Sequence, residues 1–169
     1  MVEPLYTKVK DFGMEFYSDG EGNVTYLGLS LFHTSNGAYT GNIIATEQAK
    51  RETLSRYIPT PLLGETQQRI CQILGETFKG KYQGPFGIDM MVVKSQISNL
   101  KSPLGSAASL VEEISNQLHP CVEINLRRTM GHVALALGSI CNPTADDEVR
   151  HVMRINYLNN NYKLQIRRQ

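Results

Sequence analysis

The segment formed by residues 120–131 constrains the chain most strongly, because its middle alternates between apolar and polar residues. Successive side chains of a β-strand point to opposite faces, so this period of two predicts a strand over residues 121–127. The polar residues form one row, Glu123, Asn125 and Arg127. The apolar residues form the row behind it, Val122, Ile124 and Leu126. A carboxylate, an amide oxygen and a guanidinium in one row can hold a hard metal ion and the phosphate that it carries.

A second carboxylate lies in another predicted strand. Residues 86–93 are strongly apolar except for Asp89. A lone buried carboxylate is costly unless it is paired or bound to a cation. Asp89 therefore either reaches solvent or a structural arginine partner, or it joins Glu123 and Asn125 in a Mg²⁺ site. Few protein ligands suffice for Mg²⁺, because the ion takes others from water and phosphate.

Length and composition limit the class of protein. The 169 residues form one domain, or one lobe of a larger one, and 41% hydrophobic residues are enough for a core. Lys and Arg number 17 against 16 Asp and Glu, which argues against nucleic acid or a membrane surface as the main partner. No apolar run could span a bilayer and no signal peptide is visible. Three widely spaced cysteines favour a reducing cytoplasm over a disulfide framework.

The remaining patterns predict an α+β fold, with an antiparallel sheet and helices packed mainly on one face. Alternating or apolar runs joined by turn residues predict two hairpins, from residues 12–17 with 24–32 and from 152–158 with 162–167. Helical spacing predicts helices from Thr60 to just before Gly80, over 109–118 and over 129–141. Residues 33–42 are rich in Ser, Asn, Gly and Thr, which predicts a surface loop or a loop that closes over a ligand.

The sequence Gly87-Ile88-Asp89, followed by Glu123-Ile124-Asn125-Leu126-Arg127, resembles the closing motifs of the ATP-grasp superfamily. In that family an Asp on one strand and a Glu-x-Asn pattern on the next bind the Mg²⁺ ions that bridge the ATP phosphates. The resemblance implies that Asp89, Glu123 and Asn125 are the metal ligands. Arg127 matches the arginine that contacts phosphate or the acyl-phosphate intermediate, which implies a catalytic role. Leu126 stands where proline is common, a departure that leaves the ligands intact.

The resemblance also covers earlier parts of the chain. Residues 2–4 look like the hinge strand, which implies that Glu3 contacts the ATP ribose, and residues 11–32 look like the hairpin that follows. The connection over residues 94–119 looks like an insertion. A lysine-bearing strand and a glycine-rich loop would precede Glu3 in the family. We therefore expect residues 1–169 to be a single domain, the C-terminal lobe of a longer enzyme whose N-terminal lobe is its partner.

The resemblance implies an ATP-dependent ligase that uses ATP and Mg²⁺, with Mn²⁺ as an alternative metal. A carboxylate substrate attacks the γ-phosphate to give an acyl phosphate, and an amine or thiol then displaces the phosphate. The expected substrates are small molecules, with neither nucleic acid nor membrane as partner, and a homodimer is left open. We expect the lobe alone to be inactive. Two alternatives stay open: a non-catalytic ATP-grasp-like binding or scaffold module, and an α+β domain whose acids form structural salt bridges.

Overall fold

The computed structural model describes residues 6–35, 38–95, 116–141, 150–158 and 161–169. Seven strands and three helices lie in this part of the chain. The strands are β1 Lys8–Ser18, β2 Val24–Ser35, β3 Ala38–Ile44, β4 Gly84–Lys94, β5 Asn116–Asn125, β6 His151–Leu158 and β7 Asn161–Arg168. The helices are α1 Glu47–Ser55, α2 Thr60–Phe78 and α3 Met130–Cys141.

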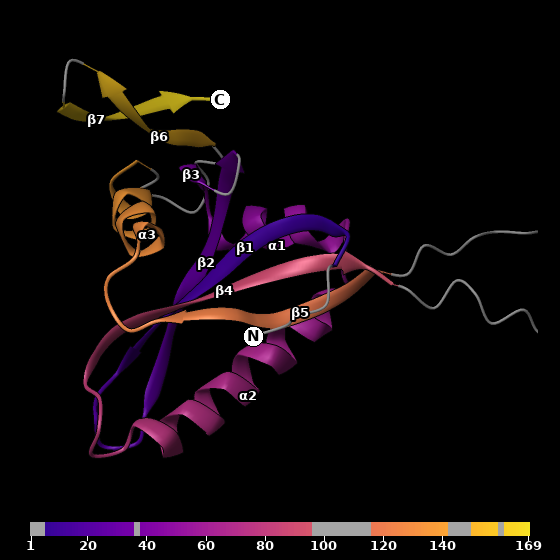
Figure 1. The fold of residues 1–169 in the computed structure, drawn as a ribbon, viewed down its shortest axis with the longest axis vertical. Coiled ribbons are helices and arrows are strands. Elements are labelled where there is room, and N and C mark those ends of the chain that lie inside the picture. Colours follow the sequence, from indigo (N-terminus) through magenta and orange to yellow (C-terminus); the bar gives the residue numbers. More distant parts are fainter. Residues whose placement is uncertain (1–5, 36–37, 96–115, 142–149, 159–160) are drawn as a thin grey trace, which may run out of the picture.

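The strands form one antiparallel sheet, which confirms the predicted α+β class. Their order is β5-β4-β1-β2-β3-β6-β7, and every neighbouring pair runs antiparallel. Both predicted hairpins are present, as β1 with β2 and as β6 with β7. The β6–β7 hairpin lies at one end of the molecule, away from β4 and β5 (Figure 1). Within the described residues, no helix has the length and apolar character needed to cross a membrane.

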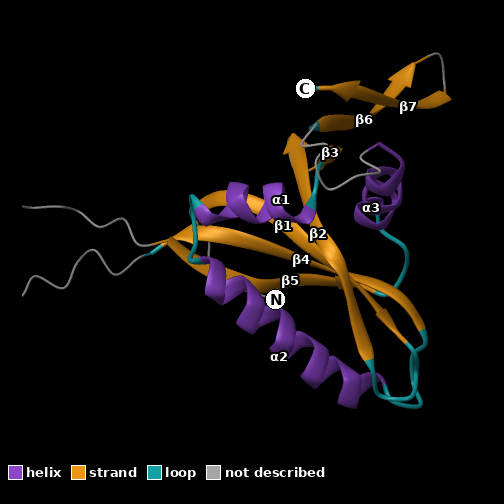
Figure 2. Cartoon of the chain, turned by 180° about the vertical axis from the view of Figure 1, so that it is seen from behind, coloured by secondary structure: helices purple, strands orange, loops and turns teal. Residues whose placement is uncertain are grey.

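One face of the sheet carries the main core. Phe12, Met14 and Phe16 alternate along β1 and are fully buried. The Phe16 ring stacks on Phe86 of β4 with 5.2 Å between centroids. Leucines of the two helices, including Leu54 of α1 and Leu63 of α2, complete this cluster. Both helices therefore cover the same face, as Figure 2 shows from behind, and this agrees with the prediction of helices mainly on one face.

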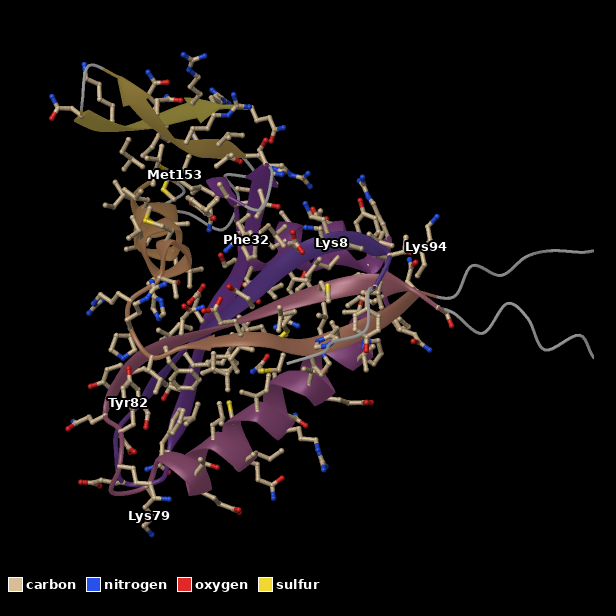
Figure 3. All side chains as sticks on the ribbon, viewed as in Figure 1. Lys8, Phe32, Lys79, Tyr82, Lys94 and Met153 are labelled. Carbon is tan, nitrogen blue, oxygen red and sulfur yellow. The ribbon has the colours of Figure 1, made fainter. Side chains whose placement is uncertain are left out.

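The third helix lies against the opposite face. Gly131 in its first turn comes so close to β1 and β2 that a Cβ there would lie 2.6 Å from Ser30 Oγ and would clash with Glu15. Further along, Ala134 packs with Ile44 and Met153 in a smaller apolar cluster, and Met153 lies between the hairpin and α3 (Figure 3). Because Glu15 and Ser30 alternate with core residues, α3 covers the polar side of the sheet.

Two expectations from the sequence are wrong. The loop predicted over residues 33–42 is the end of β2 and most of β3, which pair from Leu31↔Ile43 to Ser35↔Ala38. Its polar residues misled the assignment because a strand face that borders a polar cavity does not need apolar side chains. Residues 116–118 of the predicted helix over 109–118 belong to β5, where Leu118 pairs with Val92 and packs on the core. Residues 109–115 lie outside the described residues.

The predicted helix from Thr60 is α2, and its N-cap residue is Pro59. The helix predicted over residues 129–141 is α3. The apolar row of β5 is largely exposed, at 52% for Val122 and 41% for Ile124, because β5 is an edge strand, and Leu126 just after the strand is 50% exposed.

The start of α1 replaces a missing strand partner of β2. The last pair between β2 and β3 is Leu31↔Ile43, so the backbone of Leu29 has no partner on that side. Glu47 Oε2 accepts a hydrogen bond from the Leu29 amide at 3.0 Å, and the buried Lys50 ammonium donates to the Leu29 carbonyl at 2.8 Å. Glu47 Oε1 also accepts from the Tyr26 hydroxyl at 2.6 Å. The carboxylate thus ties α1 to the sheet.

We expect Glu47→Ala to lower the free energy of unfolding by about 1–3 kcal/mol, because it leaves the Leu29 amide and the Tyr26 hydroxyl without their acceptor. Urea unfolding measures this difference. Glu52→Ala is the matched control, since Glu52 lies on the same helix and its side chain bonds only the exposed Gln48 among the described residues. That control should change stability by no more than about 0.5 kcal/mol. Equal effects of the two substitutions would refute the role given to Glu47.

Candidate functional site

The polar face of the sheet brings the predicted row together. Asp89 of β4 lies directly opposite Glu123 of β5, and Gly87 lies opposite Asn125. Asp89, Glu123, Asn125 and Arg127 all line one cavity of about 240 Å³. Strand alternation predicted that Glu123 and Asn125 share one face, and the register of β4 against β5 places Asp89 beside Glu123.

Arg127 reaches the row by a different route from the one predicted. β5 ends at Asn125, so residues 126 and 127 lie beyond the expected strand. The backbone amide of Arg127 donates to the Asn125 carbonyl at 2.8 Å, which turns the chain. The guanidinium then folds back, and its Nη2 donates to Asn125 Oδ1 at 3.0 Å. Asn125 Nδ2 in turn lies 3.4 Å from Asp89 Oδ2 and donates to it.

The surroundings of Asp89 make its charged form unfavourable. Burial raises the pKa of this carboxyl to about 6, and the negative charges of Glu15 and Glu123 add to the rise. Arg127 and the Asn125 amide oppose it. A cation placed among these oxygens would relieve the repulsion, so the cluster has the electrostatics of a cation site.

Glu15 belongs to the same site and was not predicted. Its side chain is only 3% exposed and lines the cavity beside Asp89. Glu15 Oε2 accepts a hydrogen bond from Thr129 Oγ1 at 2.8 Å and lies 2.9 Å from His132 Nδ1. The signal was present in the sequence, because Glu15 interrupts a buried strand between Met14 and Phe16 as Asp89 interrupts β4.

The His132 ring forms an ion pair with Glu15 when it is protonated, and when it is neutral its Nδ1 can accept a hydrogen bond from the Thr129 amide at 3.2 Å. Burial disfavours the imidazolium, but the hydrogen bond and the charge of Glu15 outweigh it, so the pKa of His132 is raised. The other ring nitrogen, Nε2, lies 3.2 Å from the Phe16 carbonyl. Both contacts join α3 to β1 and fix the first turn of α3 at the rim of the cavity. Thr129, Met130 and Gly131 line the cavity there.

Two polar atoms at the cavity lack hydrogen-bond partners among the described residues. The Tyr39 hydroxyl and Asn42 Oδ1 are both buried in this way. Tyr39 and Asn42 come from β3, in the segment predicted as a loop, and both line the cavity. Asn42 Nδ2 donates to Ser30 Oγ at 2.8 Å, which fixes the orientation of the amide. A bound polar group or water would satisfy the two remaining atoms.

The donor set suits Mg²⁺ in kind but is small. Among the described residues, no three side chains of His, Cys, Asp or Glu are arranged to hold a metal ion. The cavity instead offers the carboxylates of Asp89 and Glu123 and the amide oxygen of Asn125. Carboxylate and amide oxygens are the protein ligands that Mg²⁺ prefers, and phosphate and water complete its shell. Asn125 Oδ1 currently accepts from Arg127, so it would have to release that arginine to bind metal.

The predicted contact of Glu3 with the ATP ribose lies outside the described residues, as does most of the predicted insertion over residues 94–119.

Comparisons with known proteins find similar chains among solved structures alone. No family model matches the chain, and no curated protein matches it. Among solved structures, it is similar to one described as an ATP-grasp superfamily protein from Archaeoglobus fulgidus, with 15% identity and a TM-score of 0.49 over 97% of this chain. It is also similar to two structures of N5-carboxyaminoimidazole synthetase from Staphylococcus aureus. One is a complex with ADP and is 12% identical to this chain, and the description of the other names no ligand and it is 13% identical. Each has a TM-score of 0.48 over 90% of this chain.

The chain spans about half of the first of these structures, at 47%, and 36% of each of the other two.

We expect Asp89→Asn to stabilise the protein at neutral pH and to leave it unchanged near pH 4. The folded carboxyl keeps its proton up to about pH 6, whereas an unfolded one loses it near 3.8. Stability therefore falls as pH rises through this window, and an amide removes the loss. The expected gain is about 1–2 kcal/mol, discounted for solvent screening.

Urea unfolding of both proteins between pH 4 and 8 measures this dependence. Glu76→Gln on the exposed side of α2 is the control and should give no pH-dependent difference. A gain of equal size at both ends of the range would show that charge on Asp89 is not the cause.

Proposed function

We propose that this chain is the nucleotide-facing C-terminal lobe of an ATP-dependent ligase, which activates a carboxylate as an acyl phosphate for attack by an amine or thiol. One observation carries the proposal: two carboxylates, an amide and a guanidinium from β4, β5 and the following turn line one cavity. The two unpartnered polar atoms on β3 support it, because they lie where a bound group would satisfy them.

Asp89, Glu123 and Asn125 are the residues that would hold Mg²⁺. When bound, the ion would neutralise charge on the ATP phosphates and orient the γ-phosphate for transfer. The raised pKa of Asp89 supports this assignment, since a divalent cation would remove the penalty that Glu15 and Glu123 impose on its carboxylate.

Arg127 would contact the transferring phosphoryl group. Its guanidinium already lies at the row, held by Asn125 Oδ1. On metal binding Asn125 would exchange this arginine for the ion, which frees the planar fork for bidentate contact with phosphate oxygens. The Asn125 amide would thus position Arg127 beside the cavity before the nucleotide binds.

The first turn of α3 would add a second anion contact. The amide of Met130 has no partner within the helix, whereas that of Gly131 donates to Thr129 Oγ1 at 3.1 Å, and the positive end of the helix dipole lies at the cavity rim. Glu15 and His132 act as positioning residues here, because they join this turn to β1 through contacts of 2.9 Å and 3.2 Å.

Binding of ADP with and without Mg²⁺ tests the proposal, measured by calorimetry on this chain and on the parent protein that carries the upstream sequence. We expect Mg²⁺ to strengthen binding and Glu123→Gln to remove at least about tenfold of that gain, because one metal ligand loses its charge. Arg127→Ala should weaken binding of ATP more than that of ADP.

Glu65→Gln, on α2 and remote from the cavity, is the matched control for loss of a carboxylate. Nucleotide binding that is equal with and without Mg²⁺ in every variant would leave the acids a structural role. Mg²⁺-dependent binding by the parent without phosphate release, for any mixture of carboxylates and amines, would favour a scaffold module.

A further inference from the structure

The C-terminal hairpin is far more basic than the rest of the chain. Residues 150–169 contain no Asp or Glu, and their cations are Arg150, Arg154, Lys163, Arg167 and Arg168. The whole chain carries a net charge of only +1. This concentration of charge plays no part in the proposed ligase site.

Three of these arginines surround one cavity. The cavity measures about 230 Å³ and is lined by Val152, Arg154, Gln165, Arg167, Arg168 and Gln169, a set called the arginine pocket below. The pairs Val152↔Arg167 and Arg154↔Gln165 are neighbours in the register of β6 against β7, so their side chains share one face of the hairpin.

Arg154 and Arg167 of the arginine pocket lie on the opposite face of the sheet from Asp89, whereas Arg168 pairs with His151 and borders the pocket from the end of β7. Met153, between the two β6 residues of the pocket, packs toward α3 on the polar side. Val152 and Arg154 therefore point to the other side, because strand side chains alternate. Arg154 is opposite Gly41, which pairs in turn with His33. Burial lowers the pKa of His33, and the charges of Lys10 and Arg154 lower it further, so positive potential extends across these strands.

The arginines of this pocket have no acidic partner among the described residues. The ion pairs within the described part of the chain are Lys8–Asp11, Arg51–Glu47 and His132–Glu15. All three lie outside the hairpin. Arg167 Nη2 donates only a long bond, 3.5 Å, to Gln165 Oε1, and Asn156 Nδ2 donates to the same oxygen at 2.9 Å. Most of the guanidinium donors therefore face the cavity or solvent.

Protection of the sheet edge against pairing with other chains does not account for these charges. Cations on an edge strand prevent it from pairing with other chains, and β7 is an edge strand. Arg154, however, lies on β6, which is paired on both sides with β3 and β7. An interior strand has no free edge to protect, so the placement of Arg154 beside Arg167 on one face needs another reason.

We propose that the arginine pocket binds the phosphate group of a ligand. Planar guanidinium forks match phosphate oxygens in bidentate geometry, and the two guanidinium groups of Arg154 and Arg167 on one face match a divalent phosphate better than a single carboxylate. The phosphate belongs either to a small molecule or to a macromolecule, and the two sources share this chemistry. The side-chain amides of Gln165 and Gln169 supply further donors at the rim.

Calorimetric titration of the full chain with pyrophosphate tests the proposal, because pyrophosphate carries the phosphate charge without a base or sugar. We expect the double variant Arg154→Gln, Arg167→Gln to lose at least about tenfold in affinity. Lys163→Gln is the matched control, since it removes an exposed cation from the same face of the hairpin outside the pocket. It should change affinity by no more than about twofold. Arg167→Lys keeps the charge but loses the fork, so intermediate weakening is expected.

Several outcomes would overturn the proposal. Citrate that binds as tightly as pyrophosphate would replace phosphate by carboxylate as the ligand chemistry. An equal loss in the control and in the double variant would reduce the pocket to a diffuse basic surface. If the double variant does not fold, NMR shifts of the arginine Nε resonances in the unchanged chain locate the ligand, and shifts outside Arg154, Arg167 and Arg168 contradict the assignment.

Two further measurements separate the sources and the sites. A phosphorylated sugar and a short single-stranded RNA, each in competition with pyrophosphate, show whether a small molecule or a macromolecule carries the phosphate. Asp89→Asn should leave pyrophosphate affinity in the arginine pocket unchanged without Mg²⁺, because it acts on the opposite face. The failure of the ligase proposal and the failure of this one are thus read from different variants.

Discussion

The arrangement of the polar face depends on the contacts that the buried Glu15 carboxylate makes with Thr129 and His132. The side chain is 3% exposed in the middle of the sheet, and the Thr129 hydroxyl and the His132 ring supply its partners. Removal of either partner would leave the buried carboxylate with a single partner, and removal of both would leave its charge without compensation. These contacts bring the start of α3 against β1, and Gly131 leaves room for them because it has no side chain. Burial is the main cause of the raised pKa of Asp89, and the charge of Glu15 adds to it, so one group positions α3 and also disfavours the charged form of its neighbour.

Sequence reasoning reached the parts of the fold that local periodicity controls. Strand alternation predicted β1, β2 and the row on β5, and helical spacing predicted α2 and α3. It failed where tertiary contacts override composition. Polar residues of β3 face a cavity rather than solvent, and Arg127 enters the row by a turn after the strand has ended. Glu15 was overlooked because its partners, Thr129 and His132, are more than 100 residues away, and only the folded sheet brings them together.

The net charge of the chain conceals a separation of charge between the two faces of the sheet. Glu15, Asp89 and Glu123 gather at one cavity on the polar face, whereas Arg154 and Arg167 point to the other side of the same sheet. Whole-chain balance argued against strongly charged partners, yet averaging over the sequence removes the pattern that a ligand would meet. Local fields near each cavity depend on nearby groups, since mobile ions screen distant charges within about 10 Å.

The exposed aliphatic row of β5 has a consequence for the behaviour of the protein in solution. β5 ends the sheet, and Val122 and Ile124 flank a line of backbone groups that no strand covers among the described residues. Such an edge is a template for a further strand, while the opposite edge, β7, carries cations that repel identical copies at low salt. The two edges of one sheet thus differ in their tendency to associate. The β5 edge favours pairing with another strand, whereas the charges at the β7 edge oppose it. Rising ionic strength screens the repulsion at β7 and leaves the apolar association at β5 unscreened.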